Sequence, residues 1–218
     1  VTLPADSLVL LPKEMSFDEA ASLPCAAVTA WHALMTRGRM QAGDTVLLQG
    51  TGGVSIFGLQ FAFAAGGHPV ITSSSDEKLA RAKALGAAAT INYNSTPEWS
   101  KAMLEATNGL GAHHILEVGG SGTLPQSLAC VAPGGNVALI GGLSGFGGEV
   151  PVLSLIGRSA SVTGIFVGSR ADFETMLQFM TRHAIRPVID RRFTFDDAAA
   201  AFDYMDTGNH FGKLVISV

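Results

Sequence analysis

The chain has 218 residues, of which 47% are hydrophobic and only 15% are charged. A chain of this length and apolar content can bury a sizeable core, which excludes intrinsic disorder. Its 14 basic and 18 acidic residues give a net charge of −4, which argues against a surface built to bind nucleic acid or an anionic membrane. Cys25 and Cys130 are the only cysteines, so no disulfide framework is expected and a reducing, cytoplasmic setting is predicted.

The first forty residues predict two short helices. Ser16 and Glu19 have the spacing of a capping box, so the first helix should begin after Ser16 and end before Pro24. Residues 26–35 form the second predicted helix, which should end near Gly38.

From residue 44 onward, strands and helices are predicted to alternate. Apolar runs predict strands at 45–49, 70–73, 89–93, 114–118, 136–140 and 161–167. Helices are predicted at 54–65, 74–85, from 95 onward and at 124–131, the second and third opening on Ser74 and Ser95 as capping residues. Helices at 171–183 and 196–205 and a strand at 213–218 complete the chain. The most apolar stretch, 54–71, is interrupted by polar residues, glycine and proline, so no membrane span is predicted.

The predicted strands are continuous apolar runs rather than alternating patterns. Such runs are typical of strands that are buried on both faces of a parallel sheet between helices. The alternation of strands and helices predicts an α/β fold. Because crossovers between parallel strands are right-handed, it would be a doubly wound parallel sheet of the Rossmann type, with six strands and helices on both faces, plus remnants of a second domain.

A glycine-rich turn links the first of these strands to its helix. Its sequence is Gly50-Thr-Gly52-Gly53-Val54-Ser55, and a turn between a strand and a helix is the context that a dinucleotide fingerprint requires. Gly50 would permit the tight turn, and Gly52 has no side chain to keep a pyrophosphate from the backbone. The free N–H groups that open the helix would bind that pyrophosphate. Ser55 stands at the third glycine position, where it is small enough for close packing and could donate to phosphate.

The end of the second strand predicts which dinucleotide binds. An acidic residue there would bind the ribose 2′-hydroxyl and repel a 2′-phosphate, but this chain has Ser73 at that position, followed by Ser74 and Ser75. These hydroxyls and Lys78, one turn into the next helix, could form a 2′-phosphate pocket. Alternatively, Lys78 lies on a solvated helix face and Ser74 serves only as a helix cap. We predict NADP as the cofactor in preference to NAD.

Several motifs resemble the medium-chain dehydrogenase/reductase superfamily, and in particular its NADPH-dependent quinone oxidoreductase-like, zinc-binding-dehydrogenase-like branch. They are Leu23-Pro-Cys-Ala-Ala-Val-Thr-Ala-Trp31, Gln49-Gly-Thr-Gly-Gly-Val-Ser55, Ser73-Ser-Ser-Asp-Glu-Lys78, Ala84-Leu-Gly-Ala87, Glu117-Val-Gly-Gly120, Ala132-Pro-Gly-Gly135 and Phe211-Gly-Lys-Leu-Val-Ile216. These motifs follow the family's order along nearly the whole chain.

The resemblance implies further cofactor contacts. Tyr93 would join Ser74 and Lys78 at the 2′-phosphate. The ends of the fifth and sixth strands would lie against the nicotinamide ring, together with Thr29. Those strand-end residues are Gly141, Gly142, Leu143, Ile165, Phe166 and Val167. No catalytic acid or base is identified.

Zinc is not expected in this chain. Cys25 matches the position of a zinc ligand in zinc-containing alcohol dehydrogenases, but a catalytic zinc needs three protein ligands. In the family, the other ligands lie in an N-terminal GroES-like barrel that this chain lacks. A small buried apolar residue is therefore the favoured interpretation of Cys25, and metal analysis of the intact protein would separate the two.

The resemblance also implies a domain organisation. Residues 1–40 would be the linker and helices that enter the cofactor domain, residues 41–194 the Rossmann domain, and residues 195–218 a helix and strand that return to the missing barrel. A homodimer through the edge of the sixth strand, 161–167, is also expected.

The function predicted from these features is that of an NADP-dependent oxidoreductase. It would transfer hydride to or from a small-molecule quinone, activated alkene or carbonyl or alcohol substrate without zinc. The alternatives are a zinc-dependent alcohol dehydrogenase and a catalytically silent dinucleotide-binding module.

Overall fold

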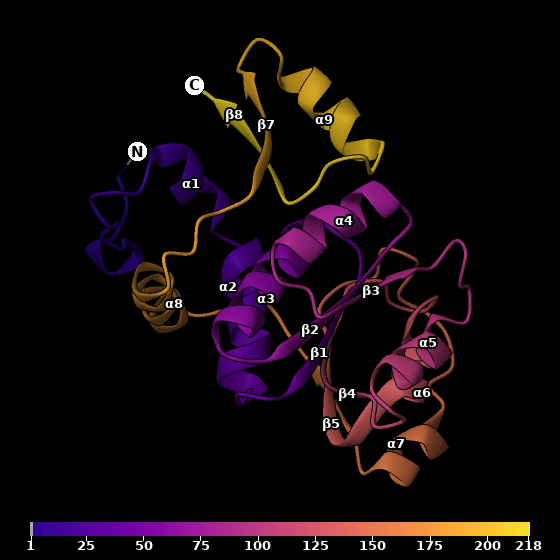
Figure 1. Ribbon diagram of the computed structural model, residues 1–218. Helices are drawn as coiled ribbons and strands as arrows, with labels where there is room; N and C mark the ends of the chain where they lie inside the picture. The colour runs from indigo at the N-terminus through magenta and orange to yellow at the C-terminus, as the bar shows by residue number, and fades with distance from the viewer. Residues whose placement is uncertain (1) are drawn as a thin grey trace.

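The computed structural model describes residues 2–218 and shows a parallel six-stranded sheet with helices on both sides (Figure 1). The strand order is β3-β2-β1-β4-β5-β6, and every pairing is parallel. The strands are β1 (Thr45–Leu48), β2 (His68–Ser73), β3 (Ala89–Asn92), β4 (Ala112–Glu117), β5 (Val131–Leu139) and β6 (Ser161–Gly164). This order confirms the predicted doubly wound Rossmann fold and puts its switch point between β1 and β4.

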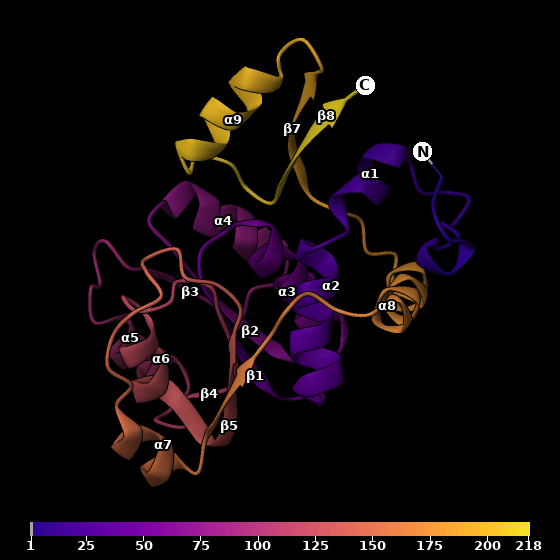
Figure 2. The ribbon, with the colours of Figure 1, turned by 180° about the vertical axis from the view of Figure 1, so that it is seen from behind.

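Helices cover both faces of this sheet, as the two views show (Figures 1 and 2). One face carries α2 (Ala26–Trp31), α3 (Gly53–Ala64), α4 (Asp76–Ala84) and α8 (Arg170–Arg182). The other carries α5 (Trp99–Ala106), α6 (Leu124–Cys130) and α7 (Val152–Arg158). On β1, the side chains of Val46 and Leu48 join the core under α3, while Leu47 joins the core under α5 and α6. All three side chains are fully buried, as expected for a central parallel strand.

The helix α3 is apolar all round because it lies between the sheet and α2. Gly58 permits the close approach: a Cβ there would lie 2.7 Å from Leu48 Cδ2 and 2.9 Å from Leu116 Cδ2. On the outer side, Trp31 of α2 and Phe179 of α8 pack against Phe61, with ring centroids 5.6 and 6.3 Å away. These contacts fix α2 and α8 against the helix that opens on the glycine-rich turn.

Most predicted elements are confirmed, but several boundaries differ. α1 (Phe17–Ser22) begins with the predicted capping box of Ser16 and Glu19. Beyond Trp31 the second helix continues as a π-helical segment, η2 (His32–Arg37), which ends at Gly38. The strand predicted at 161–167 ends at Gly164. The helix α7 was not predicted from the sequence.

Two predicted helix caps are wrong. Ser75, not Ser74, caps α4 by accepting a hydrogen bond from the Lys78 N–H. The helix α5 begins at Trp99 without a side-chain cap, because Ser95 donates to the Asn92 carbonyl instead. The first correction matters for the site, since it leaves the exposed Ser74 without a capping role.

A second, two-stranded sheet stands apart from the first at the carboxyl ends of its strands (Figure 2). It pairs β7 (Ile189–Thr194) in parallel with β8 (Lys213–Ser217), and α9 (Ala198–Asp206) connects the two strands. The strand β7 was not predicted. The strand β7 lies before the predicted domain boundary at residues 194/195, whereas its partner β8 lies after that boundary. The division at residues 40/41 and 194/195 stays a prediction.

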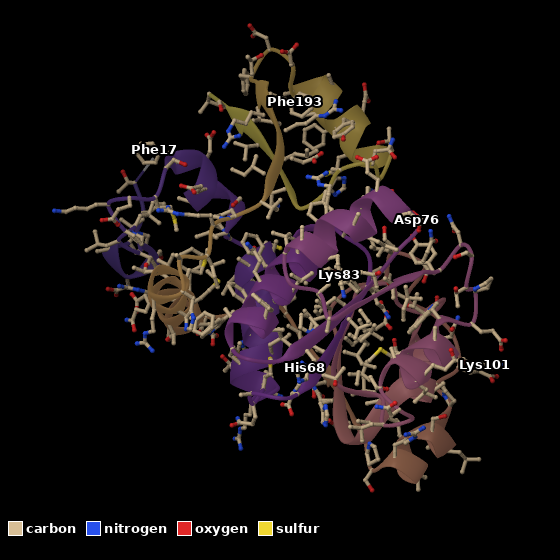
Figure 3. The ribbon with its side chains drawn as sticks, in the orientation of Figure 1. Phe17, His68, Asp76, Lys83, Lys101 and Phe193 are labelled. Atoms are coloured by element: carbon tan, nitrogen blue, oxygen red, sulfur yellow. The ribbon has the colours of Figure 1, made fainter. Side chains whose placement is uncertain are left out.

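The two ends of the strands of the main sheet can be followed in Figure 3. Asp76 marks the side where the strands end, and His68, at the start of β2, marks the side where they begin. Among residues 2–218, no helix is long and apolar enough to cross a membrane.

Candidate cofactor-binding site

A cavity of about 620 Å³ opens at the carboxyl end of β1. It lies at the switch point, where β1 pairs with β2 on one side and β4 on the other, the place where open α/β sheets bind their ligands. The residues predicted from the sequence that line it are Gly50, Gly52, Gly53, Val54, Ser55, Ser73, Ser74, Lys78, Tyr93, Gly141, Gly142 and Leu143. The fold therefore brings together segments that are nearly a hundred residues apart in the chain.

The glycine-rich turn leaves its backbone open to this cavity. Gly50 has φ +69°, in the left-handed region that favours glycine. Gly52 has extended backbone with φ −76°, and a Cβ placed on it would meet no atom within 4 Å. The helix α3 starts at the next residue without a side-chain cap, so its first N–H groups and the positive end of its dipole are available to an anion.

The Ser55 hydroxyl, for which a phosphate contact is predicted, binds within the protein, while Ser55 itself lines the cavity and its cofactor contact stays a prediction. Ser55 is buried, and its hydroxyl donates a 2.6 Å hydrogen bond to the Gln49 carbonyl. A serine hydroxyl has a single proton to donate, so this bond leaves none for a ligand. Ser55 instead ties the start of α3 to the end of β1.

The end of β2 and the start of α4 form one wall of the cavity. Ser73 is buried and its hydroxyl accepts from the Ser75 N–H at 3.3 Å, whereas Ser74 is exposed. Lys78 Nζ reaches into the cavity rim and donates to the Gly208 carbonyl at 2.5 Å. Partial burial lowers the pKa of Lys78. An ammonium group that has lost some of its water here favours an anionic ligand.

Four of the predicted residues lie outside this cavity. Thr29 and Ile165 are buried, and Phe166 is 95% exposed. Val167, whose φ is +52°, lines a separate hollow of about 460 Å³ together with Cys25. The structure therefore places Val167 and Cys25 in one hollow, which shares no lining residue with the cavity at the glycine-rich turn.

The segment that follows α9 forms the opposite wall, which the sequence did not predict. Gly208 and His210 line the cavity, and the Gly212 N–H donates to the Thr51 carbonyl at 2.9 Å. A Cβ on Gly53 would lie 2.7 Å from Lys213 Cδ, so that lysine passes directly over the start of α3. The Phe-Gly-Lys motif at 211–213 was the available signal, since a glycine followed by a cation suits a turn beside an anion site.

A buried polar network lies beneath the cavity at the ends of β1 and β4. Glu117 is fully buried. Its carboxylate accepts from Gln49 Nε2 at 2.7 Å and from the N–H groups of Gly119 and Gly120 at 2.9 and 3.0 Å. The hydroxyls of Ser127 and Thr123 also donate to it. Polar residues that end two apolar strands were the sequence signal. The network fixes the turn after β4, whose Val118 lines the cavity.

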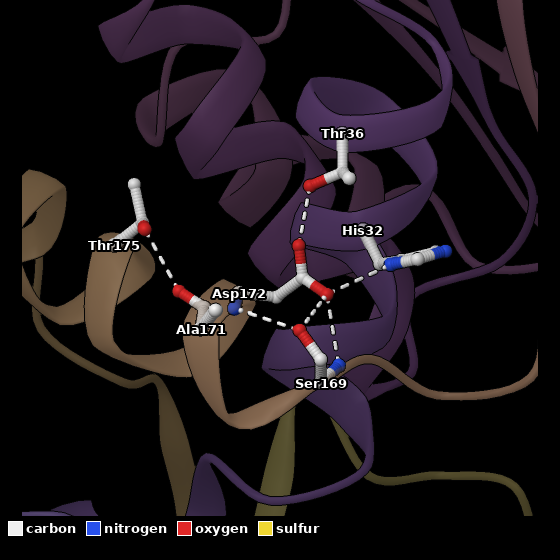
Figure 4. Close-up of polar contacts among 6 residues, drawn as sticks. All are labelled: His32, Thr36, Ser169, Ala171, Asp172 and Thr175. Carbon is white, nitrogen blue, oxygen red and sulfur yellow. Dashed lines mark hydrogen bonds and ion pairs between the residues drawn. The ribbon is translucent and has the colours of Figure 1, made fainter.

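A second network joins α8 to the helix that carries Thr29 (Figure 4). Asp172 Oδ2 lies 3.0 Å from His32 Nδ1 and accepts from the Ser169 N–H and hydroxyl at 2.8 and 2.7 Å. Its Oδ1 accepts from Thr36 Oγ1 at 2.5 Å. Burial alone would raise the pKa of Asp172, but the hydrogen bonds from Thr36, Ser169 and His32 outweigh it and hold that pKa well below its usual range.

We expect an Asp172→Asn substitution to lower the free energy of unfolding by about 2–3 kcal/mol near pH 7, because hydrogen bonds to a carboxylate lose strength when the acceptor becomes neutral. The lowered pKa means that this stabilisation is present above the unfolded-state pKa of about 4 and is lost as the pH falls further. Urea unfolding of both proteins from neutral to acid pH should therefore show the difference narrowing below about pH 4.

The matched control for this prediction is Glu174→Gln. Glu174 lies on the same helix but is half-exposed and pairs only with Arg170 in the described chain, so its loss should change stability by less than about 0.5 kcal/mol. A difference between the Asp172→Asn protein and the original that persisted undiminished at acid pH would contradict the assignment.

Within residues 2–218, no three His, Cys, Asp or Glu side chains lie close enough together to hold a metal ion. Cys25 is exposed, so the predicted burial of its side chain is wrong. Cys130 is fully buried, and burial raises its pKa to about 12, so its thiol stays protonated. The described residues thus offer at most Cys25 as a zinc ligand, against the three that a catalytic site needs, and we derive no step through zinc.

Comparison with known proteins gives a consistent set of relatives. The sequence pattern of the zinc-binding dehydrogenase family matches residues 53–182. The zinc-type alcohol dehydrogenase-like protein C1773.06c of Schizosaccharomyces pombe is 48% identical over 222 residues, covering 99% of this chain and 64% of that protein.

Solved structures share the fold over nearly the whole chain. A quinone oxidoreductase of Pseudomonas syringae pv. Tomato DC3000 superposes with a TM-score of 0.86 at 32% identity, covering 99% of this chain and 69% of its own. An NAD-dependent alcohol dehydrogenase gives a TM-score of 0.91 at 32% identity, covering 99% and 63%. Other structures with this fold are complexes with NADP or NADPH. The chain spans less than two thirds of the length of the curated relatives C1773.06c and YogA that it matches.

Proposed function

The chain belongs to the zinc-binding dehydrogenase family of the medium-chain dehydrogenase/reductase superfamily, and from this premise we propose that it is the cofactor-binding part of an NADP(H)-dependent oxidoreductase. The reaction would be hydride transfer to or from a quinone, an activated alkene or a carbonyl or alcohol compound, without zinc. The observation that carries the proposal is the open backbone at Gly52, beside the uncapped start of α3 in the 620 Å³ cavity.

Each part of a bound NADP would have its own set of residues. The backbone of Gly52, Gly53 and Val54 would hold the pyrophosphate, because N–H groups at a helix start favour negative charge. Ser74, Lys78 and Tyr93 would hold the 2′-phosphate, for which a partly buried ammonium and hydroxyl donors are suited. All of these residues line one cavity.

The nicotinamide end would lie along the strand ends that follow β5 and β6. Gly141, Gly142 and Leu143 line the cavity beyond the glycine-rich turn. The segment 165–167 and Thr29 would complete this end. The cofactor supplies the hydride; these residues would orient its ring through backbone atoms and keep water away from one face. The network around Asp172 keeps the 165–167 segment close to α2, because Ser169 and His32 share the same carboxylate oxygen.

We predict that NADPH binds at least about tenfold more tightly than NADH, since each hydrogen bond to a charged phosphate contributes about 1.5–3 kcal/mol. Titrations with the two cofactors at one fixed salt concentration measure the ratio. A Lys78→Met substitution should reduce the ratio to near one by weakening NADPH binding alone.

Lys83→Met is the matched control, because Lys83 lies on the same helix and donates to the Ala88 carbonyl, outside the cavity. It should leave both affinities unchanged. Equal dissociation constants for NADPH and NADH in the unsubstituted protein would contradict the predicted cofactor preference, and the absence of binding by either would contradict the proposed function.

A zinc-dependent alcohol dehydrogenase is the second candidate, favoured by the exposed Cys25, which lines the 460 Å³ hollow together with Val167.

A homodimer is proposed through the sheet edge formed by β6. Val162 on that edge and Leu153 and Ile156 on the neighbouring α7 are exposed apolar side chains, which a second copy would cover. A cytoplasmic setting remains part of the proposal.

A further inference from the structure

His210 is a cavity residue whose polar atoms have no partner in the described chain. Its ring lies in the wall formed by the segment after α9. Its Nδ1 is enclosed by protein and makes no hydrogen bond. Its Nε2 also makes no hydrogen bond to residues 2–218, but this nitrogen, unlike Nδ1, is not enclosed by protein. The side of the ring that can meet a ligand is therefore the Nε2 side.

The enclosed Nδ1 fixes where the single proton of a neutral imidazole sits. A buried N–H without an acceptor costs about 1–3 kcal/mol, and a proton on the accessible nitrogen avoids that cost. Neutral His210 accordingly carries its hydrogen on Nε2 and offers a donor. Burial, and then the positive charge of Lys78, lower the pKa of His210, which favours the neutral ring.

The surroundings of His210 define which kind of ligand group it would meet. Lys78 of α4 and Lys213 of β8 raise the positive potential at the ring, and Asp190 of β7 opposes them. Asp190 is already engaged by Arg81 at 3.1 Å and by the Tyr204 hydroxyl at 3.1 Å. Within residues 2–218, the one hydrogen bond of Lys78 Nζ is to a neutral acceptor, the Gly208 carbonyl. An anion that displaced this carbonyl would satisfy both Lys78 and His210.

We propose that His210 is a specificity-determining residue that donates through Nε2–H to a phosphomonoester bound beside Lys78. This inference rests on the proposed function, since NADPH has such a group and NADH does not. The chain therefore approaches the phosphate from two sides, with Lys78 and Ser74 from α4 and the turn before it, and His210 from the segment before β8.

The same geometry couples phosphate binding to a proton. A phosphate next to the ring stabilises its charged form, so the pKa of His210 is higher in the complex than in the free protein. Binding then takes up a proton, and affinity for NADPH rises as the pH falls from about 8 to about 6. Lys78, Asp190 and Lys213 are the other charged groups that act on the ring, and Arg81 pairs with Asp190. The phosphate itself titrates near pH 6, but its contribution is the same in every variant compared.

The test compares His210→Leu, which removes the donor, with His210→Gln, whose amide N–H can reach the same place. For His210→Leu we expect NADPH affinity to fall about tenfold, with NADH affinity changed less than about twofold. His210→Gln should recover part of the NADPH affinity at neutral pH. From about pH 8 to about pH 6, the NADPH affinity of the original protein should rise more steeply than that of either variant.

His68→Gln is the matched control, because His68 is exposed at the start of β2, at the opposite end of the strands from the cavity (Figure 3). It should leave the affinities for both cofactors and their pH dependence unchanged. Equal losses of NADPH and NADH affinity in His210→Leu would assign the residue a purely structural role and overturn the inference. Unchanged NADPH affinity in that variant would overturn it as well, while leaving the cofactor preference intact. If the original protein bound neither cofactor, both the proposed function and the inference would fall.

Discussion

A Gly52→Val protein is expected to fold normally and to lose at least about a hundredfold in NADPH affinity. Valine accommodates the backbone of Gly52, which is extended with φ −76° and ψ 178°. A Cβ there meets no protein atom within 4 Å, so the fold has room for the side chain. The same room is where the pyrophosphate must approach the backbone N–H groups that open α3. The substitution therefore removes the binding site without disturbing the core.

Calorimetric titration with NADPH and urea unfolding measure the two halves of this expectation. The unfolding free energy should change by no more than about 1–2 kcal/mol, since Gly52 occupies the N-cap position of α3, where valine is less favourable than glycine. Gly157→Val is the matched control, because a Cβ on Gly157 of α7 also meets nothing within 4 Å but lies far along the chain from the turn. A folded Gly52→Val protein that kept its NADPH affinity would show that the turn is structural only.

The β-α alternation was predictable because the buried strands carry their signal in every residue. Val46, Leu47 and Leu48 are all buried, and only a parallel sheet covered on both faces requires such a run. The strand β7 lacks that signal: its Asp190, Arg191 and Arg192 are charged residues of a small, half-exposed sheet. Its pairing with β8 is a long-range event that local pattern cannot reveal.

The residues of the cofactor site also fall into those that a local sequence pattern reveals and those that it does not. Gly50, Gly52 and Gly53 were predictable because a turn between a strand and a helix needs those conformations locally. The Ser55 hydroxyl donates to the Gln49 carbonyl, and this contact is set by packing that sequence spacing does not reveal. His210 was missed because it lies just before the Phe-Gly-Lys motif at 211–213 and outside it, and because this segment meets the glycine-rich turn only in the folded chain.

The largest loss of stability is expected from Glu117→Ala. The carboxylate of Glu117 accepts hydrogen bonds from Gln49, Gly119 and Gly120 in a fully buried place, and two hydroxyls also donate to it. Alanine leaves several buried donors without an acceptor, each costing about 1–3 kcal/mol. We expect the free energy of unfolding to fall by about 4–6 kcal/mol, a large part of the 5–15 kcal/mol that domains usually have.

Urea unfolding and thermal melting measure this loss, and Glu105→Ala is the matched control. Glu105 lies on α5 of the same face and is exposed, so its removal should change stability by less than about 0.5 kcal/mol. Glu117→Gln keeps the shape but turns one carboxylate oxygen into an N–H₂ that faces other donors, so it should fall between the two. If Glu117→Ala cost less than about 1.5 kcal/mol, the network could not be what holds the turn at Val118 open beside the cavity. Because that turn lines the cavity, the NADPH affinity of the folded fraction should fall along with stability, whereas the Glu105→Ala protein should bind as before.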